Sequence, residues 1–403
     1  MNPKTILTFI LSGILGYSAF AQTPTNPKLD SLIHKNAFYY KNGNFNGEGW
    51  EFLKKEILKS QIIVIGEQHG IAEIPIFCGK VAEIQQPKAL IGEIDPYTAE
   101  QLEKISVDTS QYSRYFKQKP YDFAFFSWKT EMALARKMVL AHTALWGVNE
   151  INFLSLPTFF EKLASLAKSP SNKKAALAKA VAYAKNDLPL YGDINKYNDF
   201  IAYRIKEATV DSLIYSFRNE SPRSKKMLTD LRSSLPIFAN TNYQLRVNLM
   251  KKNLLNYLQP YITEDAINIP KLLFKLGANH GTRAETWIDT PEVCSLADNL
   301  ADASGTKSLH ILIFGKQGTI NTMAPVNNTI AIQPYDGIDD MKGFEAFFSL
   351  VEKDEWSVYD LRPIRYALKT GQLKISSPDL KQYVLGYDLL VLFDKTTGNK
   401  FIE

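Results

Sequence analysis

Residues 61–73 read QIIVIGEQHGIAE, and this stretch decides the fold. Its four consecutive β-branched residues, Ile62 to Ile65, are typical of a strand that is buried on both faces. A second apolar run at 271–281, KLLFKLGANHG, has the same ending. Both runs end in Gly-x-x-His, first with His69 and then with His280. Ligands bind at the carboxyl ends of the strands of an open α/β sheet, so we expect these two histidines to mark the functional edge.

Strand and helix patterns alternate on both sides of this stretch. Apolar runs predict strands near residues 62–66, 89–93, 144–148, 272–276, 309–314 and 387–393. The helical spacing of apolar residues predicts helices at 50–59, 73–84, 98–105, 127–142 and 293–301. Strands that alternate with helices form βαβ units, which place the strands in parallel. The predicted fold class is therefore α/β, with a mostly parallel sheet and flanking helices.

Residues 156–257 interrupt this alternation. The segment carries no strand pattern and contains Ala- and Lys-rich stretches such as 172–185. We expect a helical inserted layer within a single α/β domain at 50–403, preceded by a polar leader at 22–49. No sequence period of 20 to 50 residues recurs, which excludes a solenoid of repeats.

The N-terminus has the features of an export signal. Lys4 precedes a mostly apolar run at 6–20, and Ala19-Phe20-Ala21 is a small-x-small cleavage site. The run is shorter than the ~20 residues that span a bilayer, so we expect cleavage rather than a membrane anchor. Residues 1–21 are then a signal peptide, the mature chain begins at Gln22, and the protein is periplasmic or secreted. Because no cysteine lies near the cleavage site, a lipid anchor is not expected.

Composition narrows the classes of partner. The net charge of +5 is spread along the chain without a dense basic block, whereas nucleic-acid binding favours a clustered basic face. No later segment is apolar enough for stable insertion into a membrane. The expected partner is therefore a small-molecule or peptide substrate.

The chain contains two cysteines, Cys78 and Cys294. We expect two buried thiols. One disulfide is the alternative, because both predicted helices that carry them follow the strands with the Gly-x-x-His motifs.

The first motif, Gly66-Glu-Gln-His69, places a carboxylate beside an imidazole. We expect Gly66 to let the chain turn sharply at φ values that other residues avoid, so that Glu67 and His69 project from the strand end. Glu73 follows one helical turn later and is expected on the rim of the same cleft. A carboxylate raises the pKa of a neighbouring histidine and fixes its tautomer, which suits a general base. The alternatives are a divalent-metal site and a helix N-terminus stabilised by acidic residues.

Two further strand ends contribute to this group. Glu93 ends the second predicted strand, where a buried carboxylate is costly unless it is paired or functional. His280 arrives from a strand far along the chain. The predicted catalytic residues are therefore His69, Glu67, Glu73, Glu93 and His280. A metal, if bound, would be held by His69, His280, Glu67 and Glu93.

Three charged residues are candidates for substrate binding. Glu131 lies on the predicted helix 127–142, Arg246 lies in the helical segment, and Arg283 follows His280. An arginine at such a place can clamp a carboxylate or a phosphate, and a structural salt bridge is the alternative. The remaining histidines are expected to be structural: His34, His142 and His310.

Several standard catalytic motifs are absent from the sequence. It has no Gly-x-Ser-x-Gly elbow, no Gly-x-x-x-x-Gly-Lys-Ser/Thr loop and no His-Glu-x-x-His helix. Hydrolysis would therefore use water activated by His and Glu, or by a metal that His and carboxylates hold. The Tyr- and Phe-rich segment 106–126 forms either an aromatic wall of a binding site or ordinary packing beneath a loop.

With these residues in place, the chain resembles the superfamily of erythromycin esterases, ChaN and TIKI/TraB proteins. The resemblance spans roughly residues 50 to 320 and is carried by Gly66–His69, Glu73, Glu93 and Gly277–His280. Weaker support comes from the Trp-Gly-Val-Asn block at 146–149 and from Arg246, Met250 and Asn253.

Each branch of this superfamily implies a different activity. The esterase branch implies a metal-independent hydrolase with His69 as general base among Glu67, Glu73, Glu93 and His280. The TIKI branch implies a divalent-metal protease, and the ChaN branch a haem-binding lipoprotein, in which the aromatic segment 112–126 would pack on the porphyrin. We expect an exported hydrolase of an ester or amide that needs no cofactor. A divalent metal, a haem or a scaffold without activity are the alternatives.

The chain departs from each branch at one point. One residue separates Glu67 from His69, whereas the esterases usually have two there. Asn149-Glu150 stands where the esterases usually have an acidic residue, and the lipidated cysteine of ChaN-type proteins is missing.

Overall fold

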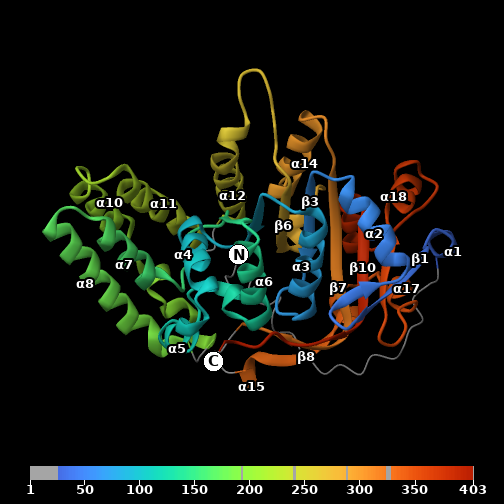
Figure 1. The fold of residues 1–403 in the computed structure, drawn as a ribbon, viewed down its shortest axis with the longest axis horizontal. Coiled ribbons are helices and arrows are strands. Elements are labelled where there is room, and N and C mark those ends of the chain that lie inside the picture. The colour runs from blue at the N-terminus through green and yellow to red at the C-terminus, as the bar shows by residue number, and fades with distance from the viewer. Residues whose placement is uncertain (1–25, 192–193, 239–241, 287–288, 324–327, 403) are drawn as a thin grey trace.

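The computed structural model describes residues 26–191, 194–238, 242–286, 289–323 and 328–402 (Figure 1). The predicted signal peptide and the predicted first residue of the mature chain, Gln22, lie outside the described residues. Within the described residues, no helix combines the length and the apolar character that a bilayer crossing requires.

A ten-stranded sheet forms the centre of the molecule, in the order β2-β1-β9-β10-β7-β3-β6-β4-β5, with β8 paired to β7 beside this path. Six neighbouring strands run in parallel. They are β10 (Leu389–Thr396), β7 (Ser308–Asn321), β3 (Ile62–Glu67), β6 (Leu272–Gly277), β4 (Ala89–Gly92) and β5 (Ala144–Gly147). All six were predicted from apolar runs, so the α/β class with a mostly parallel sheet is confirmed.

The sequence patterns did not predict the other four strands. They pair in antiparallel fashion and are β1 (Lys35–Lys41), β2 (Asn44–Asn46), β8 (Ile332–Asp336) and β9 (Trp356–Asp360). β1 has one fully buried residue, Phe38, and otherwise carries polar or half-exposed side chains, so it lacks the apolar run of a central strand. Because β1 and β2 lie within 22–49, the expected polar leader contributes two strands to the sheet.

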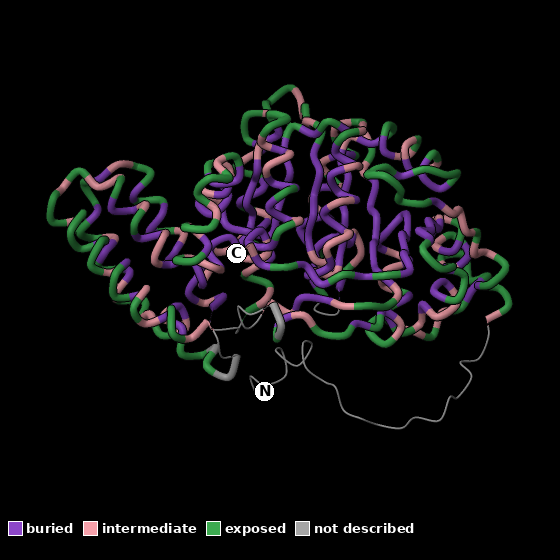
Figure 2. The backbone as a smooth tube through the Cα atoms, turned by 60° about the horizontal axis from the view of Figure 1, so that its bottom comes forward, coloured by how far each residue is buried: buried purple, intermediate pink, exposed green. Residues whose placement is uncertain are grey.

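Helices cover both faces of the sheet. One face is covered by α2 (Glu48–Leu58), α3 (Glu73–Gln85), α4 (Pro96–Val107) and α6 (Lys129–Leu140). The other face is covered by α12 (Tyr243–Leu258), α14 (Val293–Ala303), α18 (Arg362–Lys369) and α19 (Pro378–Gly386). Neighbouring residues of a strand point to opposite faces, so Ile63 and Ile65 pack under the first layer and Ile62 and Val64 under the second. Figure 2 shows the central strands as the most continuously buried part of the chain.

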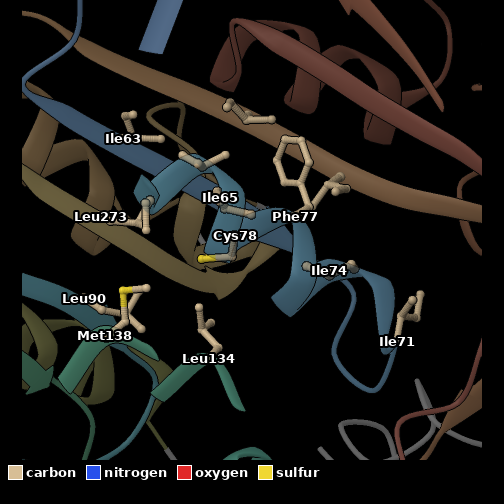
Figure 3. Close-up of a cluster of buried hydrophobic side chains, with 14 of the residues drawn as sticks. Ile63, Ile65, Ile71, Ile74, Phe77, Cys78, Leu90, Leu134, Met138 and Leu273 are labelled. Carbon is tan, nitrogen blue, oxygen red and sulfur yellow. The ribbon is translucent and has the colours of Figure 1, made fainter. Parts of the chain in front are cut away.

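The two cysteines lie on opposite faces of the sheet. Cys78 of α3 packs among Ile65, Phe77 and Leu134 (Figure 3), whereas Cys294 of α14 packs against the residues of the other face. Both thiols are free and buried. The expectation of two buried thiols is confirmed, and the alternative of a disulfide is wrong.

Between β5 and β6 the chain forms helices and no strand in the described part of 156–257, as predicted. This region contains α7 (Leu156–Leu166), α8 (Pro170–Asp187), α9 (Ile201–Arg204), α10 (Glu207–Ser216) and α11 (Pro222–Phe238), followed by α12. The first five helices share a hydrophobic core of their own and form a lobe beside the sheet (Figure 1). α12 differs, because it packs on the sheet itself.

Short helices complete the described chain. The α-helical ones are α1 (Pro27–Asp30), α5 (Tyr112–Gln118), α13 (Ala278–Gly281), α15 (Asn328–Ala331), α16 (Gly337–Asp340) and α17 (Glu345–Phe348). The 3₁₀ helices are η3 (Thr109–Gln111), η4 (Ala124–Ser127), η5 (Leu188–Leu190), η6 (Ile194–Asp199) and η7 (Gln259–Tyr261).

Candidate active site

The candidate site lies at the carboxyl edge of the parallel strands. β6 is the neighbour of both β3 and β4, so the segments that follow these three strands leave the sheet side by side. Glu67 is the last residue of β3, Glu93 directly follows β4, and His280 belongs to α13, which directly follows β6. The topology of the sheet thus brings together residues that are far apart in the sequence.

His69 is held between two carboxylates. Its Nδ1 lies 2.8 Å from Glu67 Oε1, and its Nε2 lies 3.3 Å from Glu93 Oε2. The ring also stacks on Phe125, with 4.1 Å between ring centroids and 15° between planes. The side chain of His69 nevertheless keeps 28% of its surface exposed. This imidazole is therefore fixed in orientation and still reachable from outside.

Gly66 begins the first motif and Gly70 follows it, and the sharp turn that we expected at Gly66 occurs at Gly70. Gly66 lies inside β3 and is not among the residues with positive φ. A Cβ at Gly66 would lie 2.0 Å from the hydroxyl oxygen of Tyr387, so this glycine makes room for a tyrosine packed against the strand. The prediction of a sharp turn at Gly66 was wrong. The turn comes at Gly70, which has a φ of 92°.

The glycine of the second motif makes room for the site itself. The backbone N–H of Gly277 donates to Glu93 Oε2 at 3.0 Å. A Cβ at this position would lie 3.2 Å from His69 Nε2 and 3.5 Å from Glu93 Oε2. Gly277 therefore lets the histidine of one motif approach the strand end of the other.

His280 lies on the far side of Glu93. Its Nε2 is 3.5 Å from Glu93 Oε1, and its Nδ1 is 2.8 Å from Glu292 Oε2. The ring of Tyr243 stacks on it with 5.6 Å between centroids. His280 is only 4% exposed. Glu93 thus bridges the two histidines, which lie in one cluster, and His69 is the more accessible of them.

Arg246 joins the cluster from α12. Its Nη2 donates to Glu93 Oε1 at 2.8 Å, and its Nε donates to Glu150 Oε2 at 3.1 Å. Two turns further along the helix, Asn253 Nδ2 donates to the backbone carbonyls of Val148 and Asn149 at 2.9 and 3.2 Å. The spacing of Arg246 and Asn253 therefore serves to fix α12 against the end of β5 while its arginine reaches Glu93.

Lys275 is a central residue that the sequence analysis missed. Its Nζ lies 2.5 Å from Glu67 Oε1 and 2.5 Å from Glu131 Oε1, and all three side chains are buried. The signal was present in the sequence, because a lysine interrupts the apolar run KLLFKLG. A charge inside a buried strand needs a partner of opposite charge. Tyr243 and Glu292 were also missed, and nothing in the local sequence indicates them, whereas Phe125 belongs to the segment 106–126 that was considered as an aromatic wall.

The charges of the cluster follow from these contacts. Burial disfavours a charged His69, but the carboxylates of Glu67 and Glu93 outweigh it and raise the pKa of His69 to about 9. Burial likewise opposes ionisation of Glu93, yet His280, His69 and Arg246 hold its pKa well below the usual range. For Glu67, burial is outweighed by Lys275 and His69, which lower its pKa. Burial raises the pKa of Glu131 to about 7, against the pull of Lys275. At neutral pH, His69 is an imidazolium between two carboxylates.

Three predicted residues have their side-chain contacts with groups other than His69. Glu73 begins α3, and its carboxylate accepts a hydrogen bond from the backbone N–H of Thr397 at 3.0 Å. Glu131 is buried against Lys275, not on an open surface. Arg283 donates twice to Asp388, each time at 2.7 Å, and Asp388 directly precedes β10. After His280 the chain folds back over the sheet, so Arg283 lies at the amino edge and not at the site.

The other histidines also lie away from His69. His34 and His142 are exposed. His310 is buried in β7, and its Nδ1 lies 2.8 Å from the carbonyl oxygen of Gly281. Burial and the nearby Arg283 lower the pKa of His310 to about 4, which leaves it neutral. Its place is that of a packed core residue.

The cluster does not fit a divalent metal ion. Both ring nitrogens of His69 and of His280 face carboxylates, whereas a metal-binding histidine presents a free nitrogen to the ion. Glu67 Oε1 also contacts Lys275, and Glu93 Oε1 also contacts Arg246. Across the described ranges, no group of three or more His, Cys, Asp or Glu side chains has a metal-binding arrangement.

The aromatic segment 112–126 does not fit a haem either. A tyrosine ligand would need a free phenol oxygen for the iron. The hydroxyls of Tyr112 and Tyr121 donate to the carbonyl oxygens of Ser106 and Met323, at 2.6 and 2.7 Å, and Tyr115 donates to Asp122. Phe116 and Phe123 are buried in the hydrophobic core. The segment was interpreted either as an aromatic wall of a binding site or as ordinary packing, and these contacts support packing. Phe125 is the residue of the segment that contacts His69.

A small pocket lies between the body of the domain and the helical lobe. It is lined by residues of α4 and α7 and of the segments before α4, η4 and α7, among them Asp95, Asp122, Phe123, Phe159 and Lys162. None of the predicted site residues lines it. Two of its lining residues are close in sequence to residues of the site: Asp95 follows Glu93 by two positions, and Phe123 precedes Phe125 by two.

Three solved structures share this fold. A protein from Bacillus cereus matches with a TM-score of 0.56 at 15% identity, over 94% of this chain and 100% of that chain. An erythromycin esterase mutant, EreC, in its open conformation matches with a TM-score of 0.56 at 10% identity, over 92% of this chain and 100% of that chain. A succinoglycan biosynthesis protein matches with a TM-score of 0.53 at 13% identity, over 93% and 97%. The sequence matches no family profile and no curated protein.

The architecture is therefore that of the erythromycin esterase fold, over nearly the whole chain. At these identities the likeness establishes the fold alone.

Proposed function

We propose that this protein is a hydrolase that cleaves an ester or amide bond with a water molecule activated by His69. One observation carries the proposal. The two ring nitrogens of His69 contact Glu67 and Glu93 at the carboxyl edge of the sheet, and the side chain of His69 is still 28% exposed. A fixed, accessible imidazole between carboxylates is the arrangement that general-base catalysis uses. The fold shared with an erythromycin esterase supports the same reaction class.

The chemistry assigns a role to each contact. Glu67 accepts the Nδ1 hydrogen bond and fixes the tautomer, so that the unprotonated nitrogen of neutral His69 is Nε2, and a water molecule bound between Nε2 and Glu93 can give it a proton. His69 takes one proton from the water as its oxygen attacks the carbonyl carbon, and it later gives that proton to the leaving oxygen or nitrogen. Glu93 and Glu67 stabilise the imidazolium that forms in between. Arg246 supplies positive charge on the other side of Glu93, where it can hold a polar group of the substrate.

A panel of p-nitrophenyl acetate, p-nitrophenyl butyrate and a p-nitroanilide peptide tests the proposal. We expect the wild-type protein to hydrolyse at least one of them, and His69→Ala to lose about 10²- to 10⁴-fold in kcat/KM, the usual contribution of a general base. His34→Ala is the matched control, because His34 is exposed and far along the chain from the cluster. Wild-type activity that survives in His69→Ala would refute the role of His69.

We also propose that the protein is exported and released. The support is the sequence alone: Lys4, the apolar run at 6–20 and the Ala19-Phe20-Ala21 site. Mass spectrometry of the protein secreted by an expressing bacterium should give a chain that begins at Gln22. A chain that keeps residues 1–21 and stays with the membrane would contradict this.

A further inference from the structure

Lys275 is the most unusual charged residue of the described chain that the proposed reaction does not use. It lies in the middle of the sheet on β6, paired with Ile65 of β3 and Gly92 of β4. Two positions earlier on the same face, Leu273 packs in the hydrophobic core. Lysine is almost never fully buried unless it is paired, so its position calls for a specific reason.

The reason lies in an alternation of charges across the carboxyl edge. Glu131 contacts Lys275, Lys275 contacts Glu67, and Glu67 contacts His69. His69 in turn contacts Glu93, which contacts Arg246. Each carboxylate of this row therefore has a cation next to it. Glu67 and Glu131 are both buried, and Lys275 is the cation that contacts both of them.

Two neighbouring buried carboxylates are stabilised by a cation between them, which can be a metal ion or a basic side chain, or by a proton on one of them. Carboxylates are typical ligands of divalent cations, and a buried carboxylate without a counter-charge is strongly disfavoured. Here an ammonium group at 2.5 Å from one oxygen of each carboxylate fills that position. Glu131 Oε2 has no hydrogen-bond partner in the described chain, so Lys275 is the partner that this buried carboxylate has.

We propose that Lys275 is the built-in counter-cation of this centre, a positioning residue that holds Glu67 against His69 and takes the place that a divalent ion would fill. Its amine is part of the chain, so the cluster is complete without a metal. The inference goes beyond the proposed hydrolysis and stands whichever substrate the protein acts on.

Metal binding and thermal stability of four purified variants test the proposal. Lys275→Met removes the charge and keeps much of the length of the side chain. Lys275→Met with Glu67→Gln also removes one carboxylate, and Lys275→Met with Glu131→Gln removes the other. Lys35→Met is the matched control, because Lys35 likewise bridges two glutamates, Glu352 and Glu355, at β1 and away from the site. Each variant is dialysed with Zn²⁺ or Mn²⁺ and analysed for bound metal, and its Tm is measured with and without the ion.

The proposal predicts that the wild type and Lys35→Met retain no stoichiometric metal and show the same Tm with or without it. Lys275→Met should have a lower Tm than the wild type. It should bind about one metal ion per chain, because the loss of the ammonium group frees carboxylates and an imidazole for a metal. Addition of that ion should restore part of the lost Tm. This metal binding should disappear when Glu67→Gln is added. A purely space-filling lysine would give no metal binding and no recovery.

Three results would overturn the proposal. One is stoichiometric metal in the wild type that is lost in His69→Ala. Another is a Lys275→Met variant as stable as the wild type without any metal. If Lys275→Met fails to fold, the variant with Glu131→Gln decides, because charge compensation predicts that the second substitution restores folding. If it fails equally, charge pairing is not what Lys275 provides.

Discussion

At the scale of single residues, the chemistry centres on the proton of His69. The pKa of about 9 means that His69 carries a proton at neutral pH. If His69 is the general base, only the minor neutral fraction is active there, and kcat/KM should rise with pH until it levels off above about 9. We expect this alkaline limb in a pH–rate profile measured from pH 6 to 10.5 with the best ester of the panel. A rate that falls through pH 9 would instead assign His69 as a general acid.

The raised pKa of His69 also predicts how the free energy of unfolding depends on pH. Burial opposes the charge of His69, but the two carboxylates raise its folded-state pKa from 6.5 to about 9. The folded state thus binds this proton more tightly than the unfolded chain does, and the stabilisation is fully present below about pH 6.5 and lost as the pH rises through about 9. The free energy of unfolding of the wild type, minus that of His69→Gln, should therefore shrink between pH 6.5 and 9.5. A difference that stays constant in urea titrations across this range would contradict the shifted pKa.

The residue scale also shows what sequence reasoning can and cannot find. Glu67, His69, Glu93 and His280 were predicted because each follows an apolar run, and strand ends of a parallel sheet share an edge. Lys275 breaks such a run, and a search for strand ends passes over it. Glu292 is brought to His280 by the way the chain returns after β6, which no local pattern records. Residues that complete a site through the fold, rather than through their own motif, stay hidden in one sequence.

At the scale of elements, the strength of the hydrophobic pattern determined which strands and helices could be predicted from the sequence. The six parallel strands are buried on both faces and have continuous apolar runs, so their positions were found. β1 is exposed or half-buried apart from Phe38, and the buried β9 includes the polar residues Ser357 and Asp360, so neither strand has such a run. The helical spacing in 156–257 predicted helices, but not that α12 leaves the lobe and packs on the sheet, since that depends on contacts such as Asn253 with Val148.

The two motif glycines give a prediction at this scale, because they serve different elements. In Gly277→Ala, a Cβ at 3.2 Å from His69 Nε2 should push the imidazole off its position and lower kcat more than it lowers stability. In Gly66→Ala, a Cβ at 2.0 Å from the Tyr387 hydroxyl should cost about 1–3 kcal/mol of unfolding free energy, as overpacked cores do. Urea unfolding and ester hydrolysis of both variants separate the effects. Equal losses of stability in both would mean that Gly277 serves packing and not the site.

At the scale of the whole molecule, the end of the chain holds the His69 loop in place. Beyond β10, the C-terminal segment crosses the carboxyl edge of the sheet (Figure 1). Ala72 N–H donates to the carbonyl of Thr397, and Asn399 N–H donates to that of Gly70, each at 2.8 Å. On its other side, the segment pairs with the start of α6 through Lys129 N–H and the carbonyl of Lys400 at 2.8 Å. The loop of His69 and the helix of Glu131 are thus joined by residues more than 250 positions further along the sequence.

Deletion of residues 397–403 should therefore loosen the site without removing any of its charged side chains. We expect faster amide hydrogen exchange in peptides that cover residues 68–74 and 127–131, because their backbone partners are lost. We also expect lower kcat on the best ester, since His69 would no longer be held at its two carboxylates. Lys400→Ala is the control, because it removes a side chain and keeps the backbone hydrogen bonds. Unchanged exchange in residues 68–74 after the deletion would show that β3 and α3 alone fix the His69 loop, and the C-terminal segment would then have no part in shaping the site.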